Sequence, residues 1–151
     1  MNSQIIFETK NLKRYKFPTH INDLIVDRTQ ASFCEVFMVE VEPGKSVHHH
    51  KHDDTEQIFY MIEGSGILLI GEERKEFHIK HGDVIRIPVS YYHSVRNDNE
   101  TNLKYLSIDC FGSRLPEEDS WDEHVKVMCE SNGWDYEAVV SYQRGSSTDK
   151  I

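Results

Sequence analysis

Short apolar runs, separated by turn residues, follow one another through the middle of the chain. Ala31–Val41 (ASFCEVFMVEV) is rich in β-branched and aromatic residues and ends at the turn sequence Glu42-Pro43-Gly44. The later runs are Gln57–Ile62, Gly66–Ile70, Lys75–Ile79, Val84–Ile87, His93–Arg96 and Leu103–Phe111. Short strands repeated at a spacing of roughly 8–12 residues predict a β-sandwich or β-barrel rather than an alternating α/β fold.

The periodicity becomes helical in the C-terminal part of the chain. Ser120–Glu123 has the Ser-x-x-Glu form of a capping box, and the apolar residues Trp121, Val125 and Met128 follow at helical spacing. Asn132-Gly133 is a typical C-terminal stop signal. These signals predict one helix of about three turns. We expect its apolar stripe to pack on the outer face of the barrel.

The length of 151 residues corresponds to a single domain. We place the barrel core at about residues 31–111 and a helical C-terminal extension at about 117–140. Residues 141–151 form a polar tail that we expect to be mobile.

Composition and charge exclude several classes of partner. The formal net charge of −9 disfavours binding to nucleic acid or to anionic membranes. No apolar run approaches the roughly 18 residues that a membrane span needs, and the N-terminus has no signal-peptide core. The three cysteines are odd in number and indicate reduced thiols. We therefore expect a cytoplasmic protein that acts on a small molecule.

Histidines are concentrated in the same β-rich region, and their spacing indicates a metal site. His50 and His52 are two residues apart, which places both rings on one face of an extended segment. Asp53-Asp54-Thr55 interrupts that segment, so Gln57 can face the same point from the next strand, and His93 arrives from far along the chain. Three histidines and one side-chain carbonyl form a plausible ligand set for one divalent ion, with Zn, Ni, Fe and Mn as the main candidates.

Two longer motifs contain these residues and resemble the paired motifs of the cupin superfamily. The motifs are Gly44-x5-His50-x-His52-x4-Gln57-x6-Gly64 and Gly82-x5-Pro88-x-Ser90-x2-His93-x3-Asn97. Gln57 replaces the usual Glu of the first motif, and Ser90 replaces the usual Gly of the second. The resemblance implies an all-β fold, namely one antiparallel jelly-roll barrel of six to eight strands that holds a metal ion inside. It also implies frequent pairing of barrels into dimers.

The adjacent carboxylate Glu56 is the rival of Gln57 for the fourth ligand position. Counting back from Gly64 places Gln57 in that position and turns Glu56 to the opposite face of the strand. A neutral Gln beside three neutral imidazoles leaves the full +2 charge on the metal, which favours Lewis-acid chemistry. The set His, His, Gln and His is similar to that of the cupins that open unsaturated uronate rings, and the short sugar isomerases of the superfamily also use Gln.

The residues around this ligand set leave the function open between three hypotheses. The first is a non-redox isomerase, lyase or epimerase that acts on a small carbonyl, hydroxy-acid or sugar-derived compound. The second is an Fe(II)-dependent dioxygenase, and the third is a cupin that binds a small ligand without turning it over. Glu56, Tyr92 and His48 are candidate catalytic bases, and Phe59, Met61 and Arg86 are candidate substrate contacts.

The strand Gln57–Ile62 (QIFYMI) is apolar on both faces, which bears on association. An antiparallel sheet with one face in water normally alternates to polar residues on that face. The outer side of this strand therefore needs cover, and one short helix is too small to provide it. We predict a homodimer.

Overall fold

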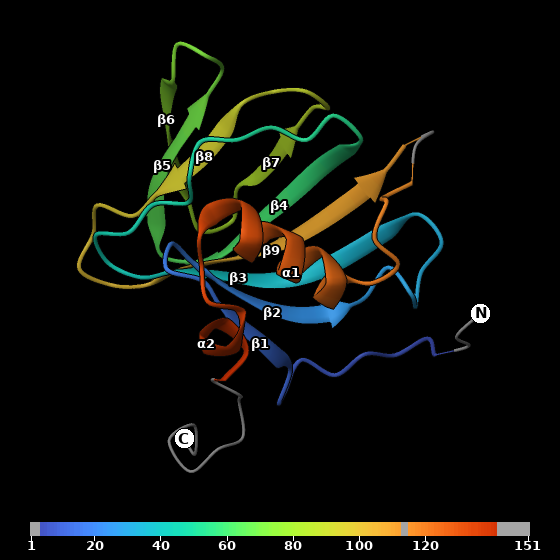
Figure 1. Cartoon of the computed structure of the whole chain (residues 1–151). Helices are drawn as coiled ribbons and strands as arrows, with labels where there is room; N and C mark the ends of the chain where they lie inside the picture. Colours follow the sequence, from blue (N-terminus) through green and yellow to red (C-terminus); the bar gives the residue numbers. More distant parts are fainter. Residues whose placement is uncertain (1–3, 113–114, 142–151) are drawn as a thin grey trace.

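The computed structural model describes residues 4–112 and 115–141, in which two antiparallel sheets face each other (Figure 1). The larger sheet has the strand order β1-β2-β3-β9-β4-β7, and the smaller sheet has the order β6-β5-β8. The strands are β1 (Lys13–Lys16), β2 (Ile21–Val26), β3 (Cys34–Val41), β4 (Thr55–Glu63), β5 (Ser65–Ile70), β6 (Lys75–Lys80), β7 (Val84–Ile87), β8 (His93–Arg96) and β9 (Leu103–Phe111). This architecture confirms the predicted all-β barrel.

The sheet begins earlier in the chain than the predicted core of residues 31–111. Strands β1 and β2 form an antiparallel pair, and β2 continues the sheet onto β3. The sequence of β2 (INDLIV) conceals its strand character, because Asn22 and Asp23 are polar although both are buried. Polar residues at these positions hide the alternation that identifies a half-buried strand.

The central strands β3 and β9 of the larger sheet alternate strictly between an inner and an outer face. Along β3 and β9 the odd-numbered residues are buried and the even-numbered ones half-buried. The register places Phe37 opposite Ser107 and Val39 opposite Tyr105. These residues point into the barrel, where they form the core together with inward residues of β4. The inner face of this sheet is therefore the wall on which a site inside the barrel is built.

Two helices follow the barrel, α1 (Trp121–Asn132) and α2 (Tyr136–Ser141). The predicted caps of α1 are confirmed: the side chain of Ser120 accepts a hydrogen bond from the Glu123 backbone N–H, and Gly133 ends the helix in the left-handed conformation. Helix α2 was not predicted; it packs against β1. The predicted mobile tail from residue 142 onward lies outside the described residues, and residue 141 ends α2.

Helix α1 packs on the inner face of the larger sheet, so its predicted position on the outer face is wrong. The Trp121 ring lies 4.4 Å from the ring of the inward residue Phe37, centroid to centroid. Trp121 and Met128 also line the central cavity, and α1 crosses in front of β3 and β9 in Figure 1. The apolar stripe of a helix shows which helix face is buried, but it does not show which face of a sheet covers it.

Within the described part of the chain, neither helix is long and apolar enough to cross a membrane. The cytoplasmic location stays a prediction.

Replacing Trp121 by alanine should destabilise the fold strongly. The Trp121 side chain is buried against Phe37 and Tyr15, and truncating a buried tryptophan costs about 3–5 kcal/mol. Chemical denaturation should show this loss in the free energy of unfolding. Val127→Ala is the matched control, because Val127 lies on the same helix but is 45% exposed. Equal unfolding midpoints for the two variants would contradict the inward packing of α1.

Candidate metal centre

A cavity of about 500 Å³ lies inside the barrel. Its wall includes inward residues of β2, β3, β4 and β9, the segment between β3 and β4, the first residues of β8, and one side of α1. His50, His52, Gln57 and His93 all line this cavity. The structure thus brings the four predicted ligands to one space.

The three histidines come from two segments that the backbone ties together. His50 and His93 form an antiparallel bridge with hydrogen bonds in both directions, 3.1 Å from His50 N to His93 O and 2.8 Å from His93 N to His50 O. The turn before β8 is tied to the next histidine, because Ser90 N donates to His52 O at 2.7 Å. Ser90 has a φ of 65°, a left-handed value that suits the glycine usual at this motif position.

The ring nitrogens of these histidines are spaced for a metal ion. One nitrogen from each ring lies within 4.8 Å of the other two, and the Nε2 atoms of His50 and His52 are 3.2 Å apart. Two ligands at about 2.1 Å from an ion, with an angle between 90° and 110°, lie about 3.0–3.4 Å apart. The observed spacing of His50 and His52 therefore matches two ligands of one ion.

Hydrogen bonds to backbone carbonyls set the tautomers of two of the rings. His50 Nδ1 lies 2.7 Å from His48 O, and His93 Nδ1 lies 2.9 Å from Tyr91 O. A carbonyl oxygen only accepts, so each Nδ1 carries the proton and each Nε2 presents a lone pair. Such carbonyl partners are typical of histidines that bind metals.

Burial keeps all three rings neutral at neutral pH, which is the form that binds a metal. It is the largest cause of the low pKa values, about 2 for His50 and about 4 for His52 and His93. Repulsion from the His93 ring lowers the pKa of His50 further.

Gln57 supplies an oxygen that has no other partner. Its amide Nε2 donates to Asp109 Oδ1 at 2.9 Å, and Asp109 also accepts from Ser107 Oγ at 3.0 Å. An ionised carboxylate only accepts hydrogen bonds, so it fixes the amide nitrogen on its own side and leaves the oxygen on the other. Gln57 Oε1 is buried and has no hydrogen-bond partner among the described residues. A buried oxygen without a partner costs free energy, and a metal ion would satisfy it. The residues present therefore fit one divalent ion.

Comparison with known proteins agrees with this geometry. A family model of the cupin domain matches residues 37–109, which include the inward strand residues and all four predicted ligands. Residues 37–109 of the chain are thus a cupin domain, and solved cupin structures share the fold. A predicted oxalate decarboxylase from Thermotoga maritima shares the fold with a TM-score of 0.66 at 20% identity, over 72% of this chain and 100% of that chain. The predicted jelly-roll barrel is thereby confirmed.

Two curated relatives match the cupin domain over a shorter region. An oxalate-binding protein of Thermotoga maritima is 33% identical over 70 residues, which make up 46% of this chain and 56% of that protein. An uncharacterized protein of Methanocaldococcus jannaschii is 36% identical over 66 residues, 44% of this chain and 51% of its own length. The match thus spans about half the length of these relatives.

Several residues predicted to serve the cupin site lie elsewhere. Glu56 and Arg86 form a 2.8 Å ion pair on the outer face of the larger sheet, away from the cavity. Tyr92 stacks on the His49 ring instead of lining the cavity. Met61 points inward but is fully buried in the core and is not part of the lining. These positions do not support the predicted roles of the four residues as bases or substrate contacts.

Two of the predicted residues do line the cavity. Phe59 is buried beside the site, with its ring 6.4 Å from that of His93. His48 is largely exposed, and its ring lies 4.6 Å from the His50 ring. Both can contact a ligand that enters the cupin barrel.

The cavity also contains polar residues that the sequence analysis missed. Arg28 donates from Nε and Nη2 to the two carboxylate oxygens of Glu35, both at 2.9 Å, and both side chains are buried. Burial raises the pKa of Glu35 to about 7, although the hydrogen bonds from Arg28 oppose this rise. Asp109 was open to prediction, because Ser107 and Asp109 share the inward parity of the apolar residues of β9. Arg28 carried no such signal, because it lies in a turn.

Proposed function

We propose that this cupin is a metal-dependent, non-redox enzyme of the isomerase, lyase or epimerase type. Its substrate would be a small polar carbonyl, hydroxy-acid or sugar-derived compound. The observation that supports this most is the neutral ligand set, three imidazole nitrogens and the unpartnered oxygen of Gln57, which line one cavity inside the barrel.

His50, His52, Gln57 and His93 would hold the ion, which is Zn, Ni, Fe or Mn. When bound, such an ion polarises a carbonyl or hydroxyl group and lowers the pKa of bound water. Because none of the four ligands is anionic, the ion keeps its full +2 charge, and Lewis-acid strength is greatest in that case. Phe59 would pack against the substrate, and the backbone bonds of His50 and His93 would hold the ligand set rigid.

The cationic side chains of the cavity lie beside carboxylates, so a bound metal ion would be the main group that attracts a ligand. Among the described residues that line it, only Arg28 and Lys51 are cationic. Glu35 occupies two donor nitrogens of Arg28, and Lys51 lies 3.6 Å from Asp53. A small molecule with two adjacent oxygens would therefore bind chiefly through the metal.

A second candidate function is binding without turnover. The relative in Thermotoga maritima that matches the cupin domain at 33% identity is an oxalate-binding protein. Oxalate is itself a small molecule with adjacent oxygens, so the same site would accommodate it.

Metal analysis after native purification, followed by oxygen uptake measurements, tests the proposal. We expect zinc or nickel in stoichiometric amount, no oxygen uptake, and conversion of a hydroxy-carbonyl compound in an NMR screen. Iron together with oxygen consumption would favour a dioxygenase and overturn the proposal. Tight oxalate binding without conversion of any compound in the screen would favour the binding function.

Substituting Gln57 by Glu should retain metal binding and lower activity. The added carboxylate binds the ion at least as well as the amide, but it cancels one unit of positive charge and so weakens Lewis-acid catalysis. We expect a loss of at least about tenfold in kcat with unchanged metal content. Glu56→Gln is the matched control on the outer face and should change neither quantity. Loss of metal from Glu56→Gln would show that the ligand register is wrong.

We also propose that the cupin is a homodimer. Met38, Leu106, Tyr60 and Val84 form an apolar row across four strands on the outer face of the larger sheet. Tyr60 is 44% and Val84 67% exposed, and α1 lies on the other face of the sheet. A closed two-fold interface there would bury more than about 1,000 Å².

Light scattering tests the dimer, with an expected mass of twice the 17.7 kDa of the chain. Tyr60→Lys should shift the mass toward that of a monomer. Phe77→Lys, at an exposed position on β6 of the smaller sheet, should not. A monomer mass for the unmodified protein at micromolar concentration would contradict the proposal.

A further inference from the structure

One histidine of helix α1 lines the same cavity as the ligand set. His124 alone, among the α1 residues that line the cavity, carries an ionisable side chain. Burial is the main cause of the lowered pKa of His52, and electrostatic repulsion from His124 contributes to the decrease. The two rings therefore lie within electrostatic range of each other across the cavity.

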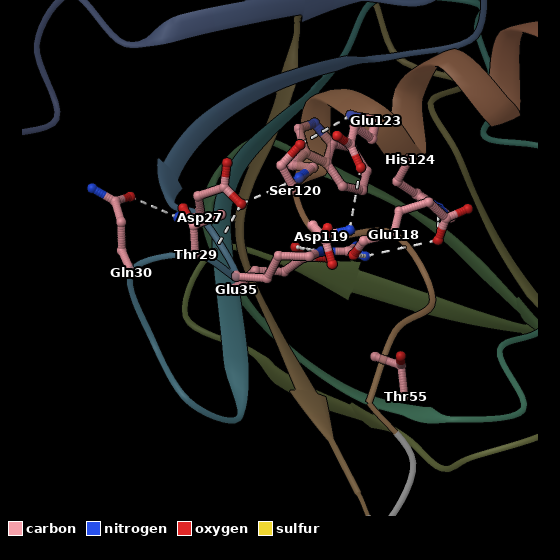
Figure 2. Close-up of polar contacts among 12 residues, drawn as sticks. Asp27, Thr29, Gln30, Glu35, Thr55, Glu118, Asp119, Ser120, Glu123 and His124 are labelled. Carbon is pink, nitrogen blue, oxygen red and sulfur yellow. Dashed lines mark hydrogen bonds and ion pairs between the residues drawn. The ribbon is translucent and has the colours of Figure 1, made fainter. Parts of the chain in front are cut away.

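The two ring nitrogens of His124 have different surroundings. Nδ1 is buried, and Oε2 of Glu118 lies 3.3 Å from it. Figure 2 shows the Glu118 side chain extended toward the ring. The alignment falls short of a full hydrogen bond, which is common for catalytic pairs without substrate. The side chain as a whole is 32% exposed and lines the cavity, so Nε2, the ring nitrogen that is not beside Glu118, is the one that a ligand would meet.

The turn between β2 and β3 holds this pair in place. Arg28 Nη1 donates to the backbone oxygen of Glu118 at 3.0 Å, and Nη2 of the same guanidinium donates to Glu35. Asp27 Oδ1 accepts a hydrogen bond of 3.2 Å from the backbone N–H of Trp121, the first residue of α1 (Figure 2). Glu118 and the start of the helix are thus fixed to the barrel wall, and His124 lies one turn further along.

Three other proton acceptors that line the cavity, Asp109, Glu35 and His20, already have hydrogen-bond partners. Asp109 accepts from Gln57 and Ser107, and Glu35 accepts twice from Arg28. His20 is buried, with Nδ1 2.8 Å from the Thr19 hydroxyl. A proton transfer between a ligand and one of these groups would break the hydrogen bonds that hold the site together.

His48 is the remaining rival, since it lines the cavity and is accessible. No hydrogen bond or ion pair recorded for the described residues joins it to a carboxylate. His124 has such a partner. A carboxylate near Nδ1 favours the tautomer with the proton on that nitrogen and the lone pair on Nε2, as in a histidine base with an orienting carboxylate.

We propose that His124 is the acid–base residue of the site and that Glu118 positions it. This inference rests on the proposed non-redox function. In the forward step the C–H bond beside the substrate carbonyl breaks and its electron pair forms the C=C bond of an enediolate. The π pair of the C=O bond moves to the carbonyl oxygen, which becomes anionic, and the proton moves to Nε2 of His124. The reverse step returns a proton from Nε2 to the same or the neighbouring carbon.

The pairing is tested without any substrate by ¹⁵N NMR of histidine-labelled protein. We expect His124 of the unmodified protein to carry its neutral-state proton on Nδ1, whereas a free imidazole favours Nε2. Glu118→Gln should shift this tautomer balance toward Nε2–H, and Glu118→Asp should restore it at least in part. A His124 ring with its proton on Nε2, unaffected by Glu118→Gln, would overturn the positioning role.

The catalytic role is tested with the zinc-loaded protein and dihydroxyacetone in D₂O, following loss of the C–H signal. His124→Gln should lower the exchange rate by about 100-fold or more, and Glu118→Gln by about tenfold or more. His78→Gln, at an exposed position on β6, is the matched control and should not change it. Zinc content and unfolding midpoint should be the same in all three variants.

The outcomes separate the two proposals. Unchanged exchange in His124→Gln, or a larger loss in His48→Gln, would overturn the role of His124. Absence of exchange in the zinc-loaded unmodified protein would count against the proposed function with this class of substrate. The tautomer measurement would in that case still decide whether Glu118 positions His124.

Discussion

Replacing His93 by alanine should abolish stoichiometric metal binding while the barrel stays folded. The side chain is 2% exposed and faces the cavity, and Tyr91 O holds Nδ1 so that Nε2 is directed to the other ligands. Loss of an outer-shell partner alone lowers metal affinity by about 10–100-fold. Loss of a ligand should lower it more. The backbone hydrogen bonds to His50 do not depend on the side chain, so the strand pairing should survive.

Metal content by mass spectrometry and circular dichroism would measure both parts of this prediction. His78→Ala is the matched control, because His78 lies exposed on β6 and does not line the cavity. It should retain one ion per chain. Native metal content in His93→Ala, with a folded barrel, would exclude His93 as a ligand.

The strands were predictable, and so were the directions in which the side chains of the first motif point. Both follow from the two-residue period of a β-strand. The run Gln57–Ile62 starts with Gln57 on the side of Phe59 and Met61, and the structure keeps that parity: all three point inward. Glu56 accordingly points outward. Parity is conserved from Gln57 to Met61, and the irregularity between Met61 and Glu63 lies beyond these residues. The motif spacing to Gly64 was therefore sufficient to choose Gln57 over Glu56.

The direction of a side chain was not predictable where the residues on both faces of a strand are apolar, or where the segment has no periodic pattern. Val84–Ile87 (VIRI) has apolar residues on both sides of Arg86, and only pairing with β4 shows that Arg86 faces outward. The contacts of Arg28 with Glu35 and Glu118 join a turn to a distant segment. Such contacts depend on the closure of the barrel and leave no local periodicity.

The position of α1 was mispredicted for a related reason. Its stripe of Trp121, Val125 and Met128 is correct as a buried face. Both faces of the larger sheet offer apolar residues, however, so the stripe alone could not decide between them. For the same reason His124 is absent from the predicted site residues, whereas the structure brings it to the cavity.

The metal-free protein should lose stability steeply as the pH falls from about 6.5 toward 4. Burial is the main cause of the low pKa values of His20, about 3, and of His93, about 4, against 6.5 for an unperturbed histidine. In this window the unfolded chain takes up protons that the folded chain does not, so the free energy of unfolding decreases with decreasing pH. Each such group lowers the free energy of unfolding by about 1.4 kcal/mol per pH unit, and the two together lower it by about 3 kcal/mol per pH unit. His50 and His52 act in the same direction.

Glu35 acts in the opposite direction, because burial raises its pKa to about 7 and the folded chain holds this proton where the unfolded chain has lost it. One such group does not offset four histidines, so the net effect remains destabilising. Urea denaturation in the presence of a chelator at pH 7.5, 6 and 5 would measure the slope. His20→Gln should reduce it by about 1.4 kcal/mol per pH unit, since His20 is buried but is not one of the proposed ligands. His78→Gln should leave it unchanged, because that ring is exposed in both states. A free energy of unfolding that stays constant from pH 7.5 to 5 would show that these rings are solvated in the folded chain.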